Sequence, residues 1–592
     1  MNNSSFFRLK TMGILFTALG LLIIMQVIRI QNSPAAQSLS ADAIKNYDYA
    51  EKTIYPERGY IFDRWGRLLA GNKEVYEVGV DLRYVKNPET ISEMAHTVLN
   101  LDYDSVHEKV SQGYMADEVE YVVLSDFVSP EQIATISETK ENYKRLTPLK
   151  KGERMPSLEG VVWAPHLQRS YPENALASNI IGFYSFGLRD KGRGYFGVEE
   201  KYNDLLAGSP IKVSVPQNPY KVREIPTIPP GASIILTIDK DIQANMESIA
   251  NNAMKRTGST SATIIVMNPK NGEILAMATT PNLNLNEYWN YEKVFPNPTP
   301  FNRAIGQTYE PGSVFKVLTM AAAVDAGVVT PDTPFLDTGS VELGGYTIYN
   351  WDRNAWGPQT MTTCMQHSLN VCLTWVAQQT GATRFYQYLQ AFGIGRKTNI
   401  DLAGEVNFPL ALPDEKNWSI VNLGTNSFGQ GVATTPLQMI TAVSSLANDG
   451  KMMAPHIIQS IVENGRQYNN TPQVIGNPVS AKTARTMTQM LAVSLEEEAS
   501  DALVEGYRVA GKTGTAEIPS PQGYVSNLTN ASFVGWGPVD DPRFVVYVWL
   551  EKPKSSQWGS IVAAPVFSQV VQSLVVSMKL PPDSTRLGLV QK

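Results

Sequence analysis

The chain has 592 residues, of which 43% are hydrophobic and 18% are charged, and this composition supports two or three folded units. A formal net charge of −6 gives no indication of a nucleic-acid partner, which would usually require a basic surface. The five histidines are scattered with no pair at metal-ligand spacing, which argues against a zinc hydrolase. We therefore expect no metal, and we expect no nucleic-acid partner.

An apolar segment near the N-terminus predicts a membrane anchor. Residues 12–28 are interrupted only by two glycines and two polar residues. As a helix they would span about 26 Å, which is at the short end of what crosses a bilayer. We place the transmembrane anchor at 12–30.

Two basic residues predict the orientation of this anchor. Arg8 and Lys10 precede the apolar segment, so the positive-inside rule places a tail of residues 1–11 in the cytoplasm and the rest of the chain outside. The competing interpretation is a signal peptide cleaved near the small residues at 33–36. Because the apolar run is longer than the usual signal core, we expect an uncleaved anchor.

A polar stalk at 31–54 and a mixed α/β domain at 55–225 are expected next. Alternating apolar and polar residues predict a strand at 75–80, and residues 130–141 read as a helix. The charged and turn-rich sequence of this domain suggests an irregular fold without a large sheet. We find no ionisable cluster in it that looks catalytic.

A break at 226–231 opens a second domain that we extend to residue 580, followed by a tail at 581–592. Strands are predicted at both ends of this domain, at 233–238, 263–267, 274–278, 531–536 and 544–550. Asn271-Gly272 indicates a two-residue hairpin turn. The last strand is apolar on both faces and should be central. Helices are expected between the strand groups and at the end, at 241–253, 314–326, 371–380, 436–448, 481–497 and 567–578.

These elements predict an α+β fold, with an antiparallel sheet assembled from both ends of the domain and an all-helical insertion between them. Cys364 and Cys372 fall within that insertion. On one continuous helix they would be roughly 12 Å apart, too far for a disulfide, although a loop between them would let them meet. We expect two free, partly buried thiols.

The first element with chemical potential is Ser313 with Lys316. Pro311 and Gly312 mark a turn that opens a helix, and Ser313 falls in its first turn, where free N–H groups favour developing negative charge. Lys316 is three residues on and shares its face. Because the helix is apolar nearly all round, it should be buried, which favours a neutral amine that can take a serine proton.

Two further elements could complete the site. Ser368 and Asn370 are two residues apart at the start of a helical stretch, where the hydroxyl could relay a proton and the amide could hold a carbonyl. Taken alone, this pattern is weak and favours a helix N-cap instead. In a strand, Lys512 and Gly514 would point one way and Thr513 and Thr515 the other. These cation and hydroxyl groups could receive a substrate carboxylate.

The three elements in this order resemble those of class B penicillin-binding proteins, the monofunctional peptidoglycan D,D-transpeptidases. Other stretches are also similar to that family, namely 58–70 and 194–202 in the non-catalytic pedestal and 428–431 with 435–438 in the catalytic domain. The resemblance implies an elongated, dimerisation-type pedestal. It also implies an α/β sandwich whose five-stranded antiparallel sheet is flanked by helices, beside an all-helical subdomain.

The resemblance also implies the roles of the residues. Ser313 would be acylated by a D-Ala–D-Ala stem peptide with Lys316 as its base, Ser368 and Asn370 would assist, and residues 512–515 would line the substrate strand. The backbone N–H groups of Ser313 and Thr515 would form the oxyanion hole. No cofactor is implied. The implied partners are stem peptides, lipid-linked nascent glycan, β-lactams, a polytopic SEDS-type glycan polymerase, and other division or elongation proteins.

Several alternatives share parts of this pattern. A β-lactamase or penicillin sensor has the same three elements, but Leu369 stands where class A lactamases carry Asp, and no deacylating glutamate is evident. A non-enzymatic scaffold would not need all three elements, and a bifunctional synthase would need a glycan-polymerising site. Segments 531–538 and 563–567 look like the division branch of class B, with the elongation branch as the alternative.

Overall fold

The computed structural model describes residues 3–38, 49–112, 120–146, 154–185, 192–216, 228–498, 500–520 and 523–588. The chain separates into two compact units. Unit 1 contains residues 1–57 and 207–231, and unit 2 contains residues 58–206 and 232–592. The unit 2 segments form the greater part of the pedestal together with the catalytic region.

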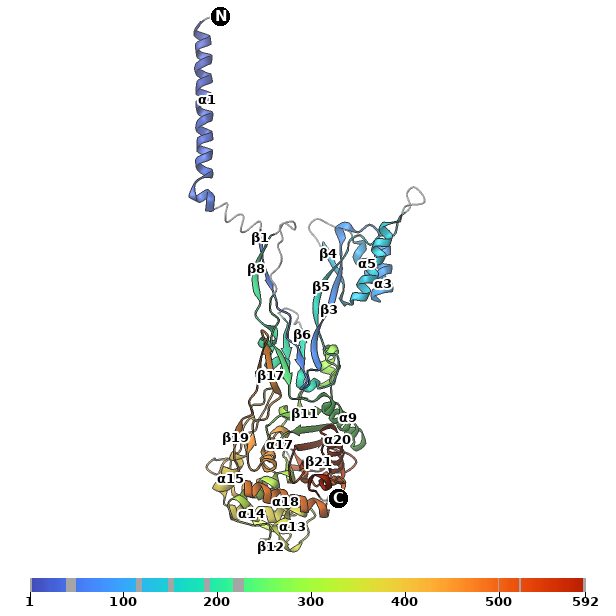
Figure 1. Ribbon diagram of the computed structural model, residues 1–592, viewed down its shortest axis with the longest axis vertical. Coiled ribbons are helices and arrows are strands. Elements are labelled where there is room, and N and C mark those ends of the chain that lie inside the picture. The colour runs from blue at the N-terminus through green and yellow to red at the C-terminus, as the bar shows by residue number, and fades with distance from the viewer. Residues whose placement is uncertain are drawn as a thin grey trace. The chain divides into compact units, whose positions relative to one another are not determined.

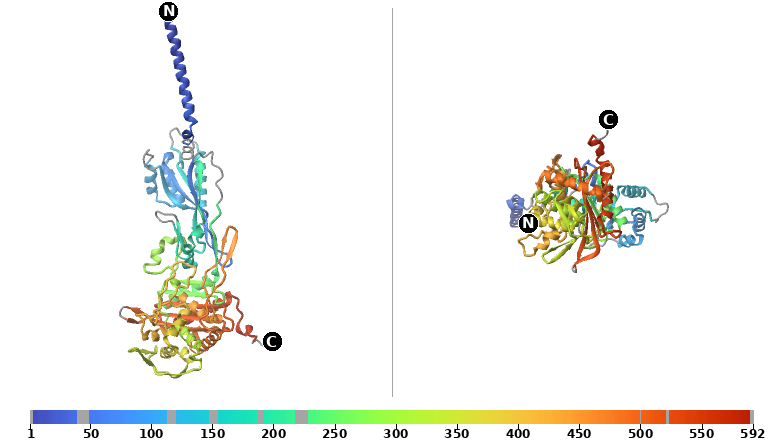
Figure 2. Two further views of the ribbon diagram at one scale, coloured as in Figure 1. Left: turned by 90° about the vertical axis from the view of Figure 1, so that its left-hand side faces the viewer. Right: turned by 90° about the horizontal axis from the view of Figure 1, so that it is seen from below.

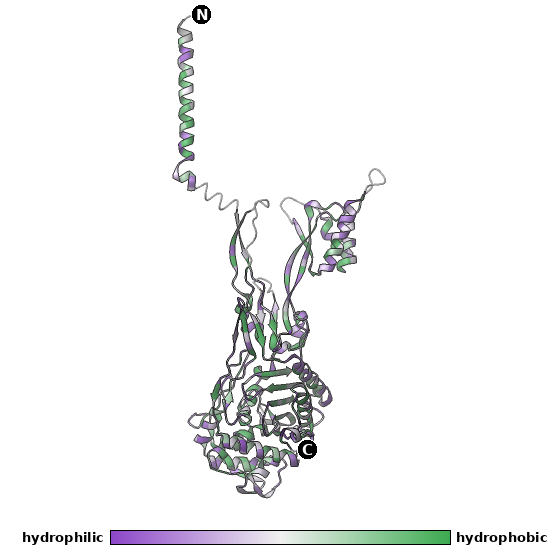
Figure 3. Cartoon of the chain, in the orientation of Figure 1, coloured by the Kyte–Doolittle hydropathy of each residue, from purple (hydrophilic) through white to green (hydrophobic). Residues whose placement is uncertain are grey.

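Unit 1 contains the predicted apolar helix. Helix α1 (Asn3–Gln31) includes a 22-residue segment with a mean hydropathy of 2.2 and no buried surface, and Figure 3 shows it as largely hydrophobic. Strand β1 (Tyr49–Ile54) pairs antiparallel with β8 (Ile211–Pro216) in the same unit. Residues 39–48 of the predicted stalk lie outside the described part of the chain.

Unit 2 contains a seven-stranded sheet, so the expectation of a pedestal without a large sheet is wrong. The order is β18-β17-β9-β2-β3-β4, and β5 also pairs with β3. The strands are β2 (Ile61–Phe62), β3 (Leu68–Asp81), β4 (Tyr121–Val128), β5 (Val161–Ser170), β9 (Ser233–Leu236), β17 (Ile458–Glu463) and β18 (Arg466–Asn469). Three of them come from the catalytic half of the sequence, and the orange hairpin β17–β18 reaches toward the pedestal strands (Figures 1 and 2). The outer strands β4 and β5 are exposed or half-buried over much of their length, and apolar residues such as Val123 and Leu167 occupy exposed positions, so their sequences show no clean alternation.

Three helices cover the buried face of β3, β4 and β5. They are α3 (Pro88–Leu99), α4 (Tyr103–Ser111) and α5 (Pro130–Lys144), and they share a hydrophobic core with Val78, Val80 and Val161 of the strands. Helix α5 was predicted from its sequence. It begins at a capping box in which Ser129 and Gln132 bond each other's backbone N–H groups.

The two pedestal motifs meet at a buried ion-pair cluster. Arg58, from the first motif, donates two hydrogen bonds to the carboxylate of Glu199, from the second motif. Arg169 of β5 donates to the other oxygen at 2.7 Å. Burial would raise the pKa of Glu199, but the two guanidinium groups outweigh burial and hold that pKa below its usual value.

The catalytic region is built on a five-stranded antiparallel sheet, as the sequence predicts. Its order is β11-β10-β22-β21-β20. The strands are β10 (Ser261–Met267), β11 (Ile274–Thr279), β20 (Ala510–Ser520), β21 (Gly523–Gly537) and β22 (Phe544–Glu551). Strand β22 is central and buried along its whole length. The β10–β11 hairpin is present, but residues 268–273 connect the strands, so the predicted two-residue turn is wrong.

Helices cover both faces of this sheet (Figure 1). Alternate residues of β22 contribute to two separate cores, with Val546 and Val548 on one face and Val545 and Tyr547 on the other. The first face packs against α9 (Lys240–Thr257), α19 (Gly559–Val562) and α20 (Ala564–Ser577), and the second packs against α12 (Lys316–Asp325) and α17 (Pro436–Ser444). The segment formed by α19 and α20 is apolar enough to span a membrane, but 61% of it is buried, and it serves as a core helix.

In chain order, the helical insertion lies between strands β11 and β20 of the five-stranded sheet. Its helices include α13 (Met361–Gln366), α14 (Asn370–Thr380), α15 (Ala382–Ala391), α16 (Ile420–Ser427) and α18 (Ala481–Glu498). It also carries two small two-stranded sheets, formed by β12 (Pro334–Asp337) with β15 (Gly357–Thr360) and by β13 (Ser340–Leu343) with β14 (Tyr346–Tyr349).

The two cysteines of the insertion form a disulfide, so the expectation of free thiols is wrong. Helix α13 ends at Gln366 and α14 begins at Asn370, and the break brings the Cα atoms of Cys364 and Cys372 to 6.2 Å. The sequence left this possibility open because a loop between the cysteines removes the separation that a continuous helix would impose.

Candidate active site

Ser313 lies in a single 3₁₀ turn, η4 (Gly312–Phe315), which leads directly into α12. Gly312 has φ +60°, a conformation that favours glycine, and the turn it makes places Ser313 at the start of the helical segment. The backbone N–H of Lys316 donates to the carbonyl of Ser313. Residues three apart in a 3₁₀ turn lie on the same face, so the two side chains face the same side.

The turn rests on the stretch at 428–434. Tyr309 and Thr434 exchange backbone hydrogen bonds of 2.9 Å in both directions, and Gly312 N–H donates to the carbonyl of Gly429 at 3.0 Å. The Gly431 N–H donates to the carboxylate of Glu310 at 3.1 Å. The family-like motif at 428–431 therefore supports the backbone around Ser313.

The other side of the turn packs against strand β20. A Cβ on Gly312 would lie 2.6 Å from the carbonyl oxygen of Thr515. A Cβ on Gly514 would lie 2.3 Å from the hydroxyl of Ser532 and 2.9 Å from Val314. Both glycines are thus needed for close approach. In this structure Gly514 approaches the serine turn and the neighbouring strand.

The side chain of Lys316 reaches the second predicted element. Its Nζ donates to the carbonyl of Ser368 at 2.6 Å, to the hydroxyl of Ser368 at 3.1 Å, and to the side-chain oxygen of Asn370 at 2.7 Å. All three acceptors are neutral, and Lys316 is fully buried. Burial, and then the positive charge of nearby Lys512, hold the pKa of Lys316 well below its usual value.

The third element forms an edge of the sheet. Strand β20 pairs only with β21 among the described strands, so its other edge has no strand partner, and an extended peptide could add to the sheet there. Lys512 is buried and donates weakly to the Thr513 hydroxyl at 3.3 Å. The hydroxyl of Thr515 accepts from Gly559 N–H at 3.0 Å, which fixes the strand against the start of α19.

Sequence reasoning missed the residues that support Ser368 and Asn370. Asp337 accepts from the side-chain amide of Asn350 and from the backbone N–H of Trp356, at 2.8 and 2.9 Å. The side-chain oxygen of Asn350 accepts from Val371 N–H at 3.2 Å. The ring of Trp356 stacks on His367 at 4.3 Å between centroids. These residues lie 12 to 33 positions before the segment they hold, and no short motif connects them to it.

A tryptophan pair that sequence reasoning also missed joins the two sides of the site. Trp351 donates its indole N–H to the carbonyl of His367, beside Ser368. Its ring meets that of Trp558 edge-on at 5.3 Å, and Trp558 precedes the glycine that contacts Thr515. Only their aromatic character was visible in the sequence.

The structure thus gathers all eight residues named from the sequence around one turn. The arrangement offers a hydroxyl on a helix start, a buried amine of lowered pKa one turn away, a second hydroxyl and an amide, and a cationic strand edge. These groups suit acyl transfer through a serine ester. The roles of the individual residues stay predictions.

Comparison with protein families covers most of the chain. Residues 262–572 match the model of the penicillin-binding protein transpeptidase domain, and residues 53–222 match the penicillin-binding protein dimerisation domain. Together these two matches include the pedestal motifs and all eight site residues.

Individual proteins are also similar to this chain over most of its length. The stage V sporulation protein D of Bacillus subtilis is 32% identical over 90% of this chain and 80% of its own length. The peptidoglycan D,D-transpeptidase FtsI of Escherichia coli is 27% identical over 90% of this chain and 86% of its own length. The crystal structure of penicillin-binding protein 2X from Streptococcus thermophilus, at 22% identity, has a TM-score of 0.73 and covers 90% of this chain and 80% of that one.

Proposed function

The chain belongs to the class B penicillin-binding proteins, and from this premise we propose that Ser313 is its acylated residue and Lys316 the base. It is a serine-type peptidoglycan D,D-transpeptidase that cross-links stem peptides and is inhibited by β-lactams. The N-terminal apolar helix makes it a single-pass membrane protein.

In the first step, the neutral amine of Lys316 takes the proton of Ser313 as its oxygen attacks the carbonyl of the penultimate D-Ala. The amide bond to the terminal D-Ala breaks, its nitrogen receives a proton through the hydroxyl of Ser368, and an ester on Ser313 remains. In the second step, an amine of another stem peptide attacks this ester. The new amide is the cross-link, and a proton lost by the attacking amine passes to the Ser313 oxygen and restores its hydroxyl.

The substrate is placed by strand β20. Lys512 and the hydroxyls of Thr513 and Thr515 provide a cation and donors for the terminal carboxylate of the donor peptide. The backbone N–H groups of Ser313 and Thr515 would stabilise the tetrahedral oxyanion. The close packing of Gly312 against Thr515 supports this assignment, because it brings the two backbone segments together.

The observation that carries the proposal is the state of Lys316. The amine is fully buried, its bonded acceptors are neutral oxygens, and a second cation lies nearby. Burial and the nearby cation favour the neutral amine, which is the form that can accept a serine proton, and the bonded oxygens carry no negative charge that would pair with the ammonium.

Mapping the β-lactam adduct tests the proposal. The full-length protein is labelled with fluorescent penicillin, digested and analysed by mass spectrometry, and we expect the adduct on Ser313. Ser313→Ala should lose all labelling. A matched control is Ser427→Ala, because the Ser427 hydroxyl donates to the Gly424 carbonyl and the substitution should leave labelling intact. An adduct on another residue, or labelling of Ser313→Ala, contradicts the proposal.

Two assays separate this reaction from its rivals. The protein should release D-alanine from a D-Ala–D-Ala stem peptide when an acceptor amine is present. It should react with nitrocefin in a slow, stoichiometric burst, whereas rapid multiple turnover would favour a β-lactamase. A Ser313→Ala strain with normal growth and cross-linking would favour a scaffold.

We further propose that the protein acts in septal wall synthesis beside a polytopic SEDS-type glycan polymerase, which would contact the anchor and pedestal. The division-like segments at 531–538 and 563–567 support this proposal, with elongation of the side wall as the alternative. A functional fluorescent fusion should gather at midcell. Signal along the side wall with none at midcell would favour elongation.

The orientation proposed from Arg8 and Lys10 gains support from the disulfide, since disulfides persist in oxidising compartments outside the cytoplasm. Protease added to intact spheroplasts should digest the catalytic region. Protection of that region until the membrane is broken would reverse the orientation.

A further inference from the structure

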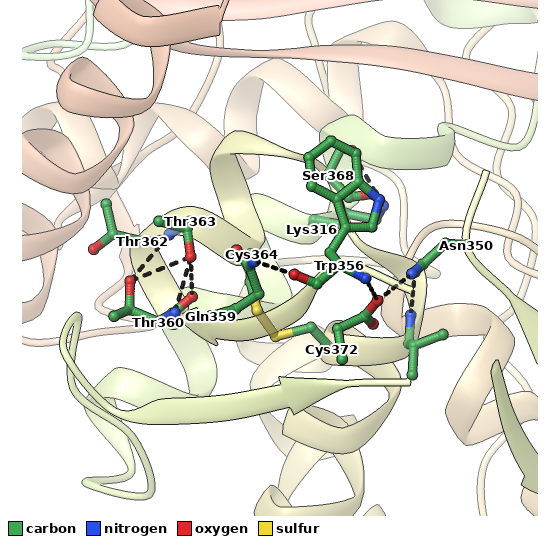
Figure 4. Close-up of a disulfide and its surroundings, with 12 residues drawn as sticks. Lys316, Asn350, Trp356, Gln359, Thr360, Thr362, Thr363, Cys364, Ser368 and Cys372 are labelled. Carbon is green, nitrogen blue, oxygen red and sulfur yellow. Dashed lines mark hydrogen bonds between the residues drawn. A yellow bond between two sulfur atoms is a disulfide. The ribbon is translucent and has the colours of Figure 1, made fainter. Parts of the chain in front are cut away.

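The disulfide closes a loop around the residues that bind Lys316. Cys364 lies in α13 and Cys372 in the first turn of α14, and the chain between them contains Ser368 and Asn370. Figure 4 shows the sulfur–sulfur bond beside Ser368 and Lys316. Both cysteines are fully buried.

The helix break inside this loop is what makes the acceptor of Lys316 available. In a continuous helix, the carbonyl of Ser368 would accept from the N–H of Cys372, four residues on. In the structure that carbonyl accepts from Lys316 Nζ instead. The break depends on Ser368 itself, whose φ of +53° is unusual for a residue with a side chain and must be imposed by its surroundings.

A disulfide and a continuous helix exclude each other over this distance. Eight helical residues would hold the two Cα atoms roughly 12 Å apart, and a disulfide requires less than about 7 Å. The bond between Cys364 and Cys372 is therefore possible only in the broken conformation. This is the conformation that turns the Ser368 carbonyl and the Asn370 amide toward the lysine.

Non-covalent contacts hold the same turn from its other side. Trp356 stacks on His367, Trp351 donates to the carbonyl of His367, and Asn350 accepts from Val371 N–H (Figure 4 shows Trp356 and Asn350). On the cysteine side, the Leu369 N–H donates to the carbonyl of Cys364 at 3.0 Å. The Ser368 N–H also donates to the carbonyl of Met365 at 3.3 Å, and the disulfide adds a covalent link to these backbone bonds.

We propose that the Cys364–Cys372 disulfide positions Ser368 and Asn370 on Lys316 and so sets the rate of serine acylation. This inference rests on the proposed roles of Ser313 and Lys316. The two cysteines are positioning residues, since they act through the turn they close. Loss of the bond removes the covalent restraint that excludes a continuous helix, so that only non-covalent contacts keep the Ser368 carbonyl on the lysine.

The test uses the full-length protein in detergent and measures acylation by fluorescent penicillin over a range of concentrations. This separates the initial binding constant from the limiting acylation rate. For Cys364→Ala/Cys372→Ala we expect the limiting rate to fall by about 10–100-fold, the effect of a misplaced catalytic group, with the initial binding constant little changed. Circular dichroism at the assay temperature establishes that the variant is folded.

Reduction of the wild type gives a second measurement that keeps both cysteine side chains. Dithiothreitol converts the disulfide to two thiols and is itself oxidised to its cyclic disulfide, and a thiol count reports completion. The reduced protein should acylate as slowly as the variant, and reoxidation should restore the rate. The double variant should not respond to dithiothreitol.

The outcomes separate this inference from the proposed function. A wild type without an adduct on Ser313 would overturn both. If the wild type carries that adduct, and the reduced protein and the folded variant acylate at its rate, only the role of the disulfide is overturned. A loss of thermal stability without a change in the limiting rate would also overturn it, because it would make the bond merely structural.

Discussion

Two fully buried charge sites in unit 2 follow opposite rules. In the pedestal, Glu199 is paired with Arg58 and Arg169, so each charge has an opposite charge within hydrogen-bond distance. In the catalytic region, the bonds of Lys316 go to neutral oxygens, and its charged neighbour is Lys512. The pairing lowers the pKa of Glu199 and keeps it ionised, whereas burial lowers the pKa of Lys316 and favours its neutral form.

The comparison teaches how one chain can use buried ionisable groups for two purposes. A compensated charge fixes the place where the two pedestal motifs meet. An uncompensated amine favours its neutral form, which is the form that the proposed role of Lys316 as the base requires. Removing a group should therefore harm folding in the first site and chemistry in the second.

Lys316→Met should give the largest effect on activity. Loss of the base should slow acylation by about 10²–10⁴-fold, the range of general base catalysis. Because no ion pair is broken, the variant should stay folded, with a thermal transition close to that of the wild type. The measurement is the time course of penicillin labelling beside a melting curve. Rapid acylation by this variant would remove Lys316 from the role of base.

Glu199→Gln should lower stability and leave activity unchanged, the reverse of Lys316→Met. It leaves two buried guanidinium groups without a counter-charge, so the free energy of unfolding should fall by about 3–5 kcal/mol. The acylation rate of the molecules that remain folded should match the wild type. Chemical denaturation and labelling of the same sample test both statements. A slowed limiting acylation rate with unchanged stability would contradict the division of roles.

Loss of the disulfide should have an intermediate effect on the free energy of unfolding. By loop-closure entropy, Cys364→Ala/Cys372→Ala should lower the free energy of unfolding by about 2–3 kcal/mol. Unlike Glu199→Gln, it should also slow acylation, since the loop carries acceptors of Lys316. Denaturant titration of both variants under the same conditions gives the comparison.

Lys512→Gln should move the pH dependence of acylation. The rate should fall as pH decreases, because protonation of Lys316 removes the base. Removing the neighbouring positive charge raises the pKa of Lys316, so this acid limb should move to higher pH. The limiting rate at saturating β-lactam is the quantity to measure, since Lys512 is also proposed to bind the carboxylate. Lys482→Gln, at an exposed position on α18, should leave the profile in place.

Glu247→Gln should give the smallest effect. Glu247 of α9 accepts from Gln243 and from Ala177 N–H, both neutral, and burial raises its pKa to about 6. The folded state therefore keeps a proton that the unfolded state has lost, and wild-type stability should decrease by up to about 2 kcal/mol as pH rises from about 4.5 to about 6. The variant should lack this decrease in denaturant titrations. If the stability of the variant decreased with pH in parallel with that of the wild type, the decrease would not arise from Glu247.

The sequence predicted the parts of the site whose geometry is local. Ser313 and Lys316 lie on one turn, and the apolar residues on both faces of β22 identified the central strand. The three elements could be named because each is a short motif with its own structural context. The α+β fold followed from strands at both ends of the catalytic region.

The remaining features depend on contacts between distant parts of the chain. The seven-stranded sheet joins pedestal strands to β9 and β17, and no local pattern shows that pairing. The disulfide could not be predicted because it depends on a three-residue break in a stretch that reads as helical. Asp337 and Asn350 support the site through a bond network that has no sequence signature.

The most direct test of the account is the titration of Lys316 itself. Full-length protein carrying lysine labelled with ¹³C at the ε carbon is followed by NMR across pH, and the signal is assigned by its absence in Lys316→Arg. We expect this lysine to titrate well below the ordinary value of 10.5, apart from the surface lysines. Titration at or above that value would contradict the account, since a charged amine cannot accept the proton of Ser313.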